Sequence, residues 1–338
     1  MIDNICGAWL TLNRNCNLHC NWCYAQNAKH GASMDLEKAI KCVNRLLELN
    51  INHITLIGGE PTIYNNIFEL IKYIKDRNIH LSMATNGIMF SEKEYAQRIV
   101  DSKLDGINIS IKGSSEEDYL LNTNSVGFNR MVNGYKNLVS YNFRPSLSYV
   151  IATNNLEELN SLIKALEKND LDNIIFQFVK PIVKEDTTPI MSMYDMADVV
   201  SFLYNRMKTS SIMYKIEISF PLCIVKKDTL NALIKEKRIT TCCHIQSGRG
   251  IVFDCDFKVL PCNHFIDLPF EERELHLDHK EEIEVLWDSK TVQDFRKKVR
   301  SYPSYRCEKC NLWDICGGGC FTRWFYEDPN IFCKGGFN

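Results

Sequence analysis

The sequence lacks a strong excess of charge, a long apolar run and an export signal. Its 40 Lys and Arg residues are balanced by 42 Asp and Glu residues, which gives a formal net charge of −2, so no basic surplus points to a nucleic-acid partner. No stretch of about 18 apolar residues is present that would span a membrane. The first residues, MIDNICGAWLTLN, do not place a basic segment before an apolar run and a cleavage site. We therefore expect a cytoplasmic protein that binds neither nucleic acid nor a membrane.

Cysteine is nearly absent from the middle of the chain and crowded toward its two ends. Between residues 43 and 241 only Cys223 occurs, whereas the whole chain has 15 cysteines. An odd number of cysteines in two clusters of a cytoplasmic protein is typical of metal ligands and not of disulfides. Cys6, Cys42 and Cys223 match no motif, and we predict that they are small buried hydrophobic residues.

Short runs rich in β-branched residues alternate with amphipathic helical segments from residue 8 to about residue 180. One helical segment, 36–49, places Leu36, Ile40, Val43 and Leu47 on one face, and a second lies at 156–166. Six such repeats favour a parallel α/β sheet, curled as a partial barrel or open and doubly wound. The predicted strands are residues 8–13, 53–59, 80–85, 106–111, 146–152 and 173–179. Further helices are expected near 195–208 and 226–237.

The stretch CNLHCNWC, residues 16–23, spaces Cys16, Cys20 and Cys23 as C-x3-C-x2-C directly after the first predicted strand. A structural zinc site takes four protein ligands. A cubane iron–sulfur cluster held by only three thiolates instead keeps one iron open for a small molecule. Two alternatives are a zinc site completed by His19 or His30, and chance spacing.

A second motif, LIGGEPT at residues 56–62, ends the second predicted strand. The pair Gly58 and Gly59 allows backbone to approach a ligand closely, and the neighbouring carboxylate of Glu60 is suited to an ammonium group. A tight turn from strand to helix would also explain the glycines and Pro61, but it would not explain Glu60.

Together the two motifs resemble the radical S-adenosylmethionine (SAM) superfamily. Its C-x3-C-x-φ-C motif is present with Trp22 as the aromatic φ, and its GGE motif is Gly58-Gly59-Glu60. The resemblance implies a partial (β/α)6 TIM-like barrel over residues 8 to about 180. It also implies a 4Fe–4S cluster on the three clustered cysteines, whose open iron chelates the amine and carboxylate of SAM. An electron from the cluster would cleave SAM to a 5′-deoxyadenosyl radical, which abstracts hydrogen from a substrate.

The same resemblance implies which residues contact SAM. Trp22 is expected near the adenine, Gly59 and Glu60 at the methionine amine, and Ser110, in ISIKG, near the ribose or the carboxylate. Many relatives carry an Arg where this sequence has Asn122, so the group that holds the SAM carboxylate stays open. The full set of expected SAM contacts is Trp22, Gly58, Gly59, Glu60, Thr85, Asn86 and Ser110.

The stretch CEKCNLWDICGGGC forms a second cysteine run, C-x2-C-x5-C-x3-C. Taken alone it also fits a zinc ribbon. With the cysteines before and after it, the run resembles the SPASM domain, a C-terminal extension with up to two auxiliary 4Fe–4S clusters, although Phe257 stands where that family usually has Gly.

Domains are therefore expected at 1–180 (barrel), 181–240 (linker or bridging helices) and 241–338 (SPASM), with three 4Fe–4S clusters in all. The expected auxiliary ligands are Cys242 or Cys243, Cys255, Cys262 and Cys320 for the nearer cluster, and Cys307, Cys310, Cys316 and Cys333 for the farther one.

SPASM relatives mostly act on peptides, so the resemblance implies an oxidative peptide modification such as a crosslink or thioether. Sulfatase activators of this group carry an Asp base where this sequence has Asn263, which argues against that reaction. The next residue, His264, is either an acid/base catalyst or a structural histidine. Because Cys16 comes so early, we expect leader recognition by a separate protein or by the barrel itself, and a flavodoxin- or ferredoxin-type electron donor. The alternatives are a small molecule or sugar as substrate, and a non-catalytic iron–sulfur protein.

Overall fold

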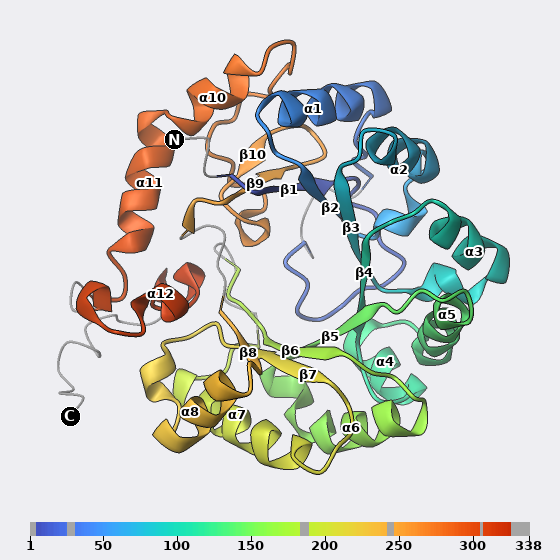
Figure 1. Ribbon diagram of the computed structural model, residues 1–338, viewed down its shortest axis with the longest axis vertical. Helices are drawn as coiled ribbons and strands as arrows, with labels where there is room; N and C mark the ends of the chain where they lie inside the picture. The colour runs from blue at the N-terminus through green and yellow to red at the C-terminus, as the bar shows by residue number, and fades with distance from the viewer. Residues whose placement is uncertain (1–4, 26–30, 183–188, 242–246, 305–306, 326–338) are drawn as a thin grey trace.

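One curved sheet with helices on its outer side organises the chain (Figure 1). The computed structural model describes residues 5–25, 31–182, 189–241, 247–304 and 307–325. The strands are β1 (Gly7–Thr11), β2 (His53–Ile57), β3 (His80–Thr85), β4 (Gly106–Ile111), β5 (Ser146–Ile151), β6 (Ile174–Phe178), β7 (Tyr214–Glu217), β8 (Ile239–Thr240), β9 (Gly250–Phe253) and β10 (Val259–Leu260). The helices are α1 (Leu36–Glu48), α2 (Ile67–Lys75), α3 (Lys93–Asp101), α4 (Glu116–Thr123), α5 (Phe128–Ser140), α6 (Leu159–Lys168), α7 (Met193–Met207), α8 (Lys227–Lys235), α10 (Glu281–Trp287), α11 (Lys290–Arg300) and α12 (Trp313–Cys316).

Strands β1 to β8 lie side by side in sequence order and pair in parallel. At the other edge, β9 pairs in parallel with β1, and β10 pairs antiparallel with β9. Parallel strands need crossover connections, and the helices that supply them lie outside the curve of the sheet (Figure 1). The six predicted strands are β1 to β6, and the prediction of a partial TIM-like barrel is confirmed.

The two faces of the sheet differ in polarity, and this difference creates a central cavity. In β4, Ile107, Ile109 and Ile111 are buried in the core, whereas Asn108 and Ser110 face the cavity. The polar residues bond to one another across strands, as where Ser148 Oγ donates to Asn108 Oδ1 over 2.7 Å. Apolar side chains of alternate residues thus anchor the helices, while short polar side chains leave room at the centre of the barrel.

Helix α1 shows how an outer helix is held against the sheet. Asp35 caps it, because its Oδ1 accepts a hydrogen bond from Lys38 N over 3.0 Å. The buried residues of this helix are Ala39, Cys42, Val43 and Leu46. Of the four residues predicted to form the apolar face, only Val43 is among them. Leu36, Ile40 and Leu47 are half-buried because the small Ala39 and Cys42 form the line of closest approach to the sheet.

Residues 181–240, predicted as a linker or bridging segment, contribute two strands to the sheet. β7 pairs with β6 in the register that sets Glu217 beside Gln177, and β8 pairs with β7. The predicted helices in this segment are confirmed as α7 and α8. The missed signal is the alternation of Tyr214, Ile216 and Ile218, which are all buried.

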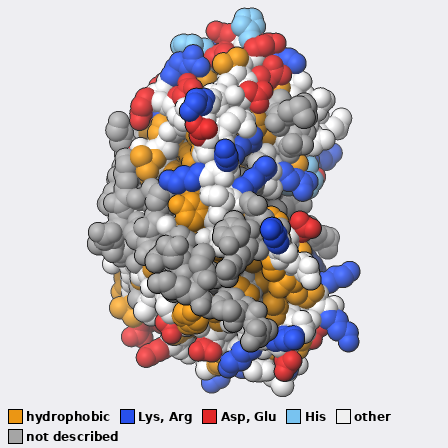
Figure 2. Space-filling model, turned by 90° about the vertical axis from the view of Figure 1, so that its left-hand side faces the viewer, with side chains coloured by type: hydrophobic (Ala, Val, Ile, Leu, Met, Phe, Trp, Pro, Cys, Tyr) orange, Lys and Arg blue, Asp and Glu red, His pale blue; other side chains and the backbone are white. Residues whose placement is uncertain are grey.

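The C-terminal helices α10, α11 and α12 cover the side of the molecule where β10 and β8 end the sheet (Figure 1). Helix α12 is tied to the residue after β8, because Thr241 Oγ1 donates to the carbonyl oxygen of Ile315. Figure 2 shows this face, with Lys and Arg side chains across its middle and Asp and Glu side chains toward both ends. No helix in the part of the chain that the structure describes combines the length and apolar composition that a membrane crossing needs.

Candidate active site

Cys16, Cys20 and Cys23 lie on the loop that follows β1, at the carboxyl ends of the barrel strands. All three line a cavity of about 380 Å³ together with residues from β2 to β6. The loop is held from outside by carbonyl groups near the end of α4, since His19 N donates to Thr123 O and Asn21 N donates to Asn122 O, each over 3.0 Å. The predicted position of the three thiols at the barrel mouth thus agrees with the structure.

The surroundings of these thiols suit a cluster that carries negative charge on sulfur. Burial, with smaller contributions from the negative charges of Glu60, Cys20 and Cys23, raises the pKa of Cys16 to about 12, so a thiolate here needs hydrogen-bond donors or a bound metal to compensate its charge. Backbone N–H groups already point at sulfur, from Leu18 to Cys16 Sγ and from Ala25 to Cys23 Sγ, both over 3.4 Å. Such donors compensate thiolate charge. Among the described residues no three Cys, His, Asp or Glu side chains are gathered as ligands of a single metal ion, so the assignment rests on the shared cavity and these donors.

Gly58 and Gly59 let the loop after β2 pack against the backbone of the cysteine loop. A Cβ atom on Gly59 would lie 2.1 Å from the carbonyl oxygen of Asn15. Two backbone hydrogen bonds of 2.7 Å seal the contact, from Gly59 N to Asn13 O and from Glu60 N to Asn15 O. The close approach that the glycines allow is therefore to the chain itself, and it fixes the loop that carries Cys16.

Replacing Gly59 with alanine should lower the free energy of unfolding by about 2–3 kcal/mol, because backbone must move to admit the methyl group. Urea denaturation followed by circular dichroism measures this. The matched control is Gly106→Ala in β4, where the nearest atom to a new Cβ is 3.5 Å away. An equal and small loss in both variants would contradict the role given to the Gly59 contact.

Glu60 is buried, and its carboxylate ties three loops together. Its Oε1 accepts hydrogen bonds from Thr62 N (3.1 Å), Thr62 Oγ1 (2.6 Å) and Thr85 Oγ1 (2.6 Å), and its Oε2 accepts one from Asn86 N (2.8 Å). Burial raises the pKa of Glu60, and these four hydrogen bonds oppose the rise. Asn86 Nδ2 in turn donates to Asn17 Oδ1 on the cysteine loop over 2.6 Å. Hydrogen bonds therefore link the loops after β1, β2 and β3 to one another.

The structure places every predicted SAM contact on the same cavity as the three thiols: Trp22, Gly58, Gly59, Glu60, Thr85, Asn86 and Ser110. Trp22 is buried against Ala152 and Val179. Its indole Nε1 has no hydrogen-bond partner among the described residues.

Lys112 also lines this cavity, and sequence reasoning did not select it. Its Nζ donates to Ser110 Oγ over 2.6 Å, and its charge opposes the burial that raises the pKa values of Cys20 and Cys23. Asn122, by contrast, is not among the lining residues. Its side chain donates to Lys112 O and to both carboxylate oxygens of Glu158. The signal for Lys112 was its place in ISIKG, at the end of β4.

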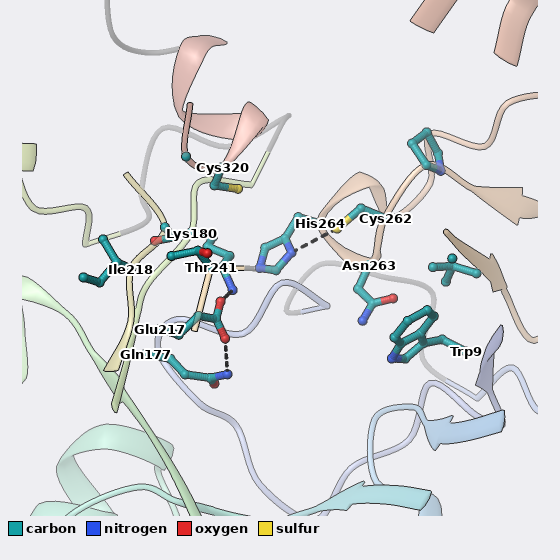
Figure 3. A pocket seen from close by; sticks show the side chains of 15 residues that line it. Trp9, Gln177, Lys180, Glu217, Ile218, Thr241, Cys262, Asn263, His264 and Cys320 are labelled. Carbon is teal, nitrogen blue, oxygen red and sulfur yellow. Dashed lines mark hydrogen bonds and ion pairs between the residues drawn. The ribbon is translucent and has the colours of Figure 1, made fainter. Parts of the chain in front are cut away.

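A second chamber of about 370 Å³ adjoins the first and brings Cys262 and Cys320 to one cavity (Figure 3). Trp9, Gln177, Lys180, Asn263 and His264 line both cavities. The two cavities are therefore continuous through shared lining residues. The second one is lined by Cys262 and Cys320, which are far apart in the sequence.

His264 belongs to the short helix η6 (Asn263–Phe265) and lies in this chamber. Its Nδ1 is 3.6 Å from Cys262 Sγ, as the dashed line in Figure 3 marks. Burial, with a smaller contribution from the positive charge of Lys180, lowers the pKa of His264 to about 3. Its acid/base role stays a prediction.

The sequence predicts Cys255 and Cys262 as ligands of one cluster. Cys255 lies in the turn between β9 and β10, whereas Cys262 follows the end of β10. Cys255 is buried and is absent from the lining of both cavities. Cys262 lines the second chamber and Cys255 does not, so the assignment of Cys255 to the same cluster stays a prediction.

The remaining cysteines divide into three groups. Cys307, Cys310 and Cys316 lie around α12, outside the chamber. Cys242, Cys243 and Cys333, predicted as further ligands, fall outside the described residues. Of the three cysteines predicted to be buried, Cys42 is buried but Cys6 and Cys223 are exposed. Cys223 is exposed because its short helix, η5 (Leu222–Ile224), lies at the surface beside Cys316, whose Sγ accepts a hydrogen bond from Leu222 N.

An ion pair that the sequence did not reveal joins the cysteine loop to the β9–β10 hairpin. Arg14 Nε donates to Asp254 Oδ1 over 2.9 Å, and a second bond joins Arg14 Nη2 to Asp254 Oδ2. Both side chains are buried. Such a two-pronged contact fixes orientation as well as distance, so the C-terminal hairpin helps to position the loop that carries Cys16.

Comparisons with known proteins agree with this arrangement. The family model described as "Radical SAM superfamily" matches residues 10–166. An uncharacterized protein of Methanocaldococcus jannaschii is 31% identical over 196 residues, which cover 56% of this chain and 68% of that protein. A probable GTP 3′,8-cyclase of Methanococcus maripaludis is 37% identical over 105 residues, or 30% of this chain and 35% of the cyclase. The alignments with such cyclases thus span only about a third to a half of those proteins.

Two solved structures share the fold over nearly the whole chain. Streptococcus suis SuiB bound to S-adenosylmethionine superposes with a TM-score of 0.71 at 15% identity, over 96% of this chain and 75% of SuiB. The protein anSMEcpe with bound AdoMet and the Kp18Cys peptide superposes with a TM-score of 0.70 at 18% identity, over 97% of this chain and 96% of that one. These likenesses extend through the C-terminal region, which the family model does not reach.

Proposed function

This chain belongs to the radical SAM superfamily, and we propose that it is a radical SAM enzyme of the SPASM type that oxidatively modifies a peptide. Superfamily membership implies a 4Fe–4S cluster and SAM as cofactors. The observation that carries the proposal is the shared cavity, where the three thiols of the first loop and the GGE loop meet beside a second, cysteine-lined chamber.

The residues of the first cavity fit the cluster that the family requires. Cys16, Cys20 and Cys23 would hold it, with backbone N–H groups supporting the charge on sulfur. When bound, the cluster supplies the electron that cleaves SAM to methionine and a 5′-deoxyadenosyl radical. The chain's own contribution is to hold the cysteine loop still, through Gly59, Glu60 and Arg14, and to exclude water with Trp22 and the buried walls around it.

We propose that Lys112 holds the SAM carboxylate, since position 122 carries Asn and not Arg. It brings a positive charge to the cavity from the end of β4, beside Ser110. The Asn122 amide, in contrast, is directed to Glu158. An ammonium group inside a partly buried cavity forms a charge-assisted hydrogen bond with a carboxylate, which is roughly twice as strong as a neutral one.

Replacing Lys112 with methionine should raise the dissociation constant for SAM roughly tenfold to hundredfold, because a charged hydrogen bond is lost. Equilibrium binding of SAM to the cluster-loaded enzyme measures it. Lys164→Met is the matched control, since Lys164 is exposed on α6. Unchanged SAM affinity in the Lys112 variant would rule out this contact.

The C-terminal region supports the proposal of two auxiliary clusters, for three in all. Cys262 and Cys320 would hold the nearer cluster, and Cys307, Cys310 and Cys316 the farther one. The Cys262 thiol and the Cys320 thiol face the same chamber from different parts of the chain (Figure 3). A cluster held by these residues would supply a group that accepts an electron from a substrate radical.

A peptide is the substrate class that we propose, for two reasons. SuiB bound to its precursor peptide SuiA superposes over 96% of this chain, and anSMEcpe with a bound peptide over 97%. The GTP 3′,8-cyclases are closer in sequence, but the alignments with them cover between 30% and 49% of this chain. A small molecule or sugar is the alternative. We also propose a flavodoxin- or ferredoxin-type electron donor, and a separate leader-binding protein as a possible partner.

The test is reconstitution of the enzyme with iron and sulfide, followed by incubation with SAM and a reductant. Formation of 5′-deoxyadenosine and about 12 irons per chain are the expected results. A candidate precursor peptide should then lose hydrogen, which mass spectrometry detects. Absence of 5′-deoxyadenosine from a fully loaded enzyme would contradict the proposed function.

A further inference from the structure

The second chamber is lined by a half-buried ion pair. Lys180, just after β6, binds Glu217 Oε1 at the end of β7, and Gln177 Nε2 on β6 donates to Glu217 Oε2 over 2.6 Å (Figure 3). The side chains of Lys180 and Glu217 are 23% and 21% exposed. Strand register sets this arrangement, because Gln177 and Glu217 are direct partners on neighbouring strands.

The ion pair faces the place where a substrate would lie. Lys180 and Gln177 line both the chamber and the SAM cavity, and Glu217 lines the chamber. A group held against them would therefore be within reach of both cavities. The carboxylate of Glu217 binds the ammonium of Lys180 on one side and an amide on the other, so its negative charge is matched.

Uncharged hydrogen-bonding groups also line the chamber, and two of them are unmatched. Ser219 Oγ and Asn263 Oδ1 are buried and have no hydrogen-bond partner among the described residues. The Ser219 side chain is both a donor and an acceptor, and the Asn263 oxygen is an acceptor. A buried group of this kind is costly unless a ligand supplies its partner. An amide, which offers one N–H donor and one C=O acceptor, matches both.

We propose that the Lys180–Glu217 pair makes this chamber selective for an uncharged hydrogen-bonding group, such as a peptide amide, and selective against a nucleoside triphosphate. The pair does so by neutralising an ammonium group that would otherwise attract phosphate. This inference rests on the proposed function and narrows its substrate class. It distinguishes a peptide, as bound in the SuiB and anSMEcpe structures, from a nucleoside triphosphate, which the name of the GTP 3′,8-cyclases indicates.

The inference predicts that removing the Glu217 charge converts the chamber into an anion site. Isothermal titration of inorganic tripolyphosphate, and of GTP, into the SAM-loaded holoenzyme measures it. Glu217→Gln should bind tripolyphosphate roughly tenfold more tightly than wild type, or better, because the substitution removes the negative charge that neutralises Lys180. Glu217→Asp keeps the charge and should behave as wild type.

Two further variants show whether the gain acts through Lys180. The double variant Lys180→Gln with Glu217→Gln removes both charges and should return to wild-type affinity. Glu167→Gln frees Arg206 from an ion pair on the outer surface and should change nothing. A gain that persists in the double variant, or that appears equally in Glu167→Gln, overturns the proposal.

The wild-type enzyme alone also tests the inference, should Glu217→Gln fail to fold by circular dichroism. Tight binding of GTP by wild type that is lost in Lys180→Gln would show that the ion pair does not exclude anions, and would overturn the proposal. Formation of 5′-deoxyadenosine is measured on the same samples. Its absence would count against the proposed function and leave the anion result to decide this inference separately.

Discussion

Replacing Cys16, Cys20 and Cys23 together with alanine is expected to abolish formation of 5′-deoxyadenosine, to below about a thousandth of the wild-type rate. The three thiols line the cavity that also holds the GGE loop, and they are the only cysteines among the described residues that line it. Iron content should fall by about a third, from about 12 to about 8 per chain, because the auxiliary clusters use other cysteines. Chromatographic detection of 5′-deoxyadenosine and a colorimetric iron assay measure both quantities.

Cys6→Ala is the matched control for this triple variant. Cys6 is an exposed cysteine near the same end of the chain, and its Sγ donates a hydrogen bond to the carbonyl oxygen of Arg249 over 3.3 Å. It should leave both iron content and SAM cleavage unchanged. Persistent 5′-deoxyadenosine in the triple variant would refute the assignment. Zinc in place of iron in the wild-type protein would instead support the alternative of a zinc site.

Replacing Cys262 or Cys320 with alanine should remove the nearer auxiliary cluster and with it the modified product. Each variant should lose about four irons per chain while SAM cleavage persists, since both thiols face the second chamber and not the first cavity. Iron analysis, electron paramagnetic resonance of the reduced protein and product analysis separate these effects. A full complement of iron in both variants would mean that no cluster is held there.

Cys255→Ala discriminates between the sequence-based and the structure-based ligand sets. The sequence assigned Cys255 to the nearer cluster, but Cys255 is absent from the lining of the chamber that Cys262 and Cys320 face. We therefore expect this variant to keep all its iron and to lose at most about 1–2 kcal/mol of unfolding free energy from the loss of a small buried side chain. Loss of four irons from Cys255→Ala would restore the original assignment.

Much of the barrel and of the first cavity was readable from the sequence, because the signals are local. The alternation of Ile107, Ile109 and Ile111 with polar residues identifies β4 without any knowledge of its neighbours. Parallel strands that follow one another in sequence end at the same rim of a barrel. For that reason a cysteine run after β1 and a Gly-Gly-Glu turn after β2 could be expected to face each other, and they do.

The places where sequence reasoning failed or was silent depend on partners far along the chain. Residues 214–217 look like part of a loop until β6 is there to pair with them. Lys112 became a candidate only when folding placed its ammonium beside Ser110 and two cysteines, and the Arg14–Asp254 pair spans 240 positions. Spacing in a motif says nothing about such distances.

The sequence by itself therefore determined the superfamily, the barrel and the residues of the first cysteine loop, because each depends on periodicity or spacing within a few residues. Tertiary structure alone decided that Cys262 and Cys320 line the same chamber, whose lining does not include Cys255, and that Lys180 pairs with Glu217. The physical reason is strand register. A hairpin or a strand pair brings together residues that share a level and separates those that do not, whatever their distance in the sequence.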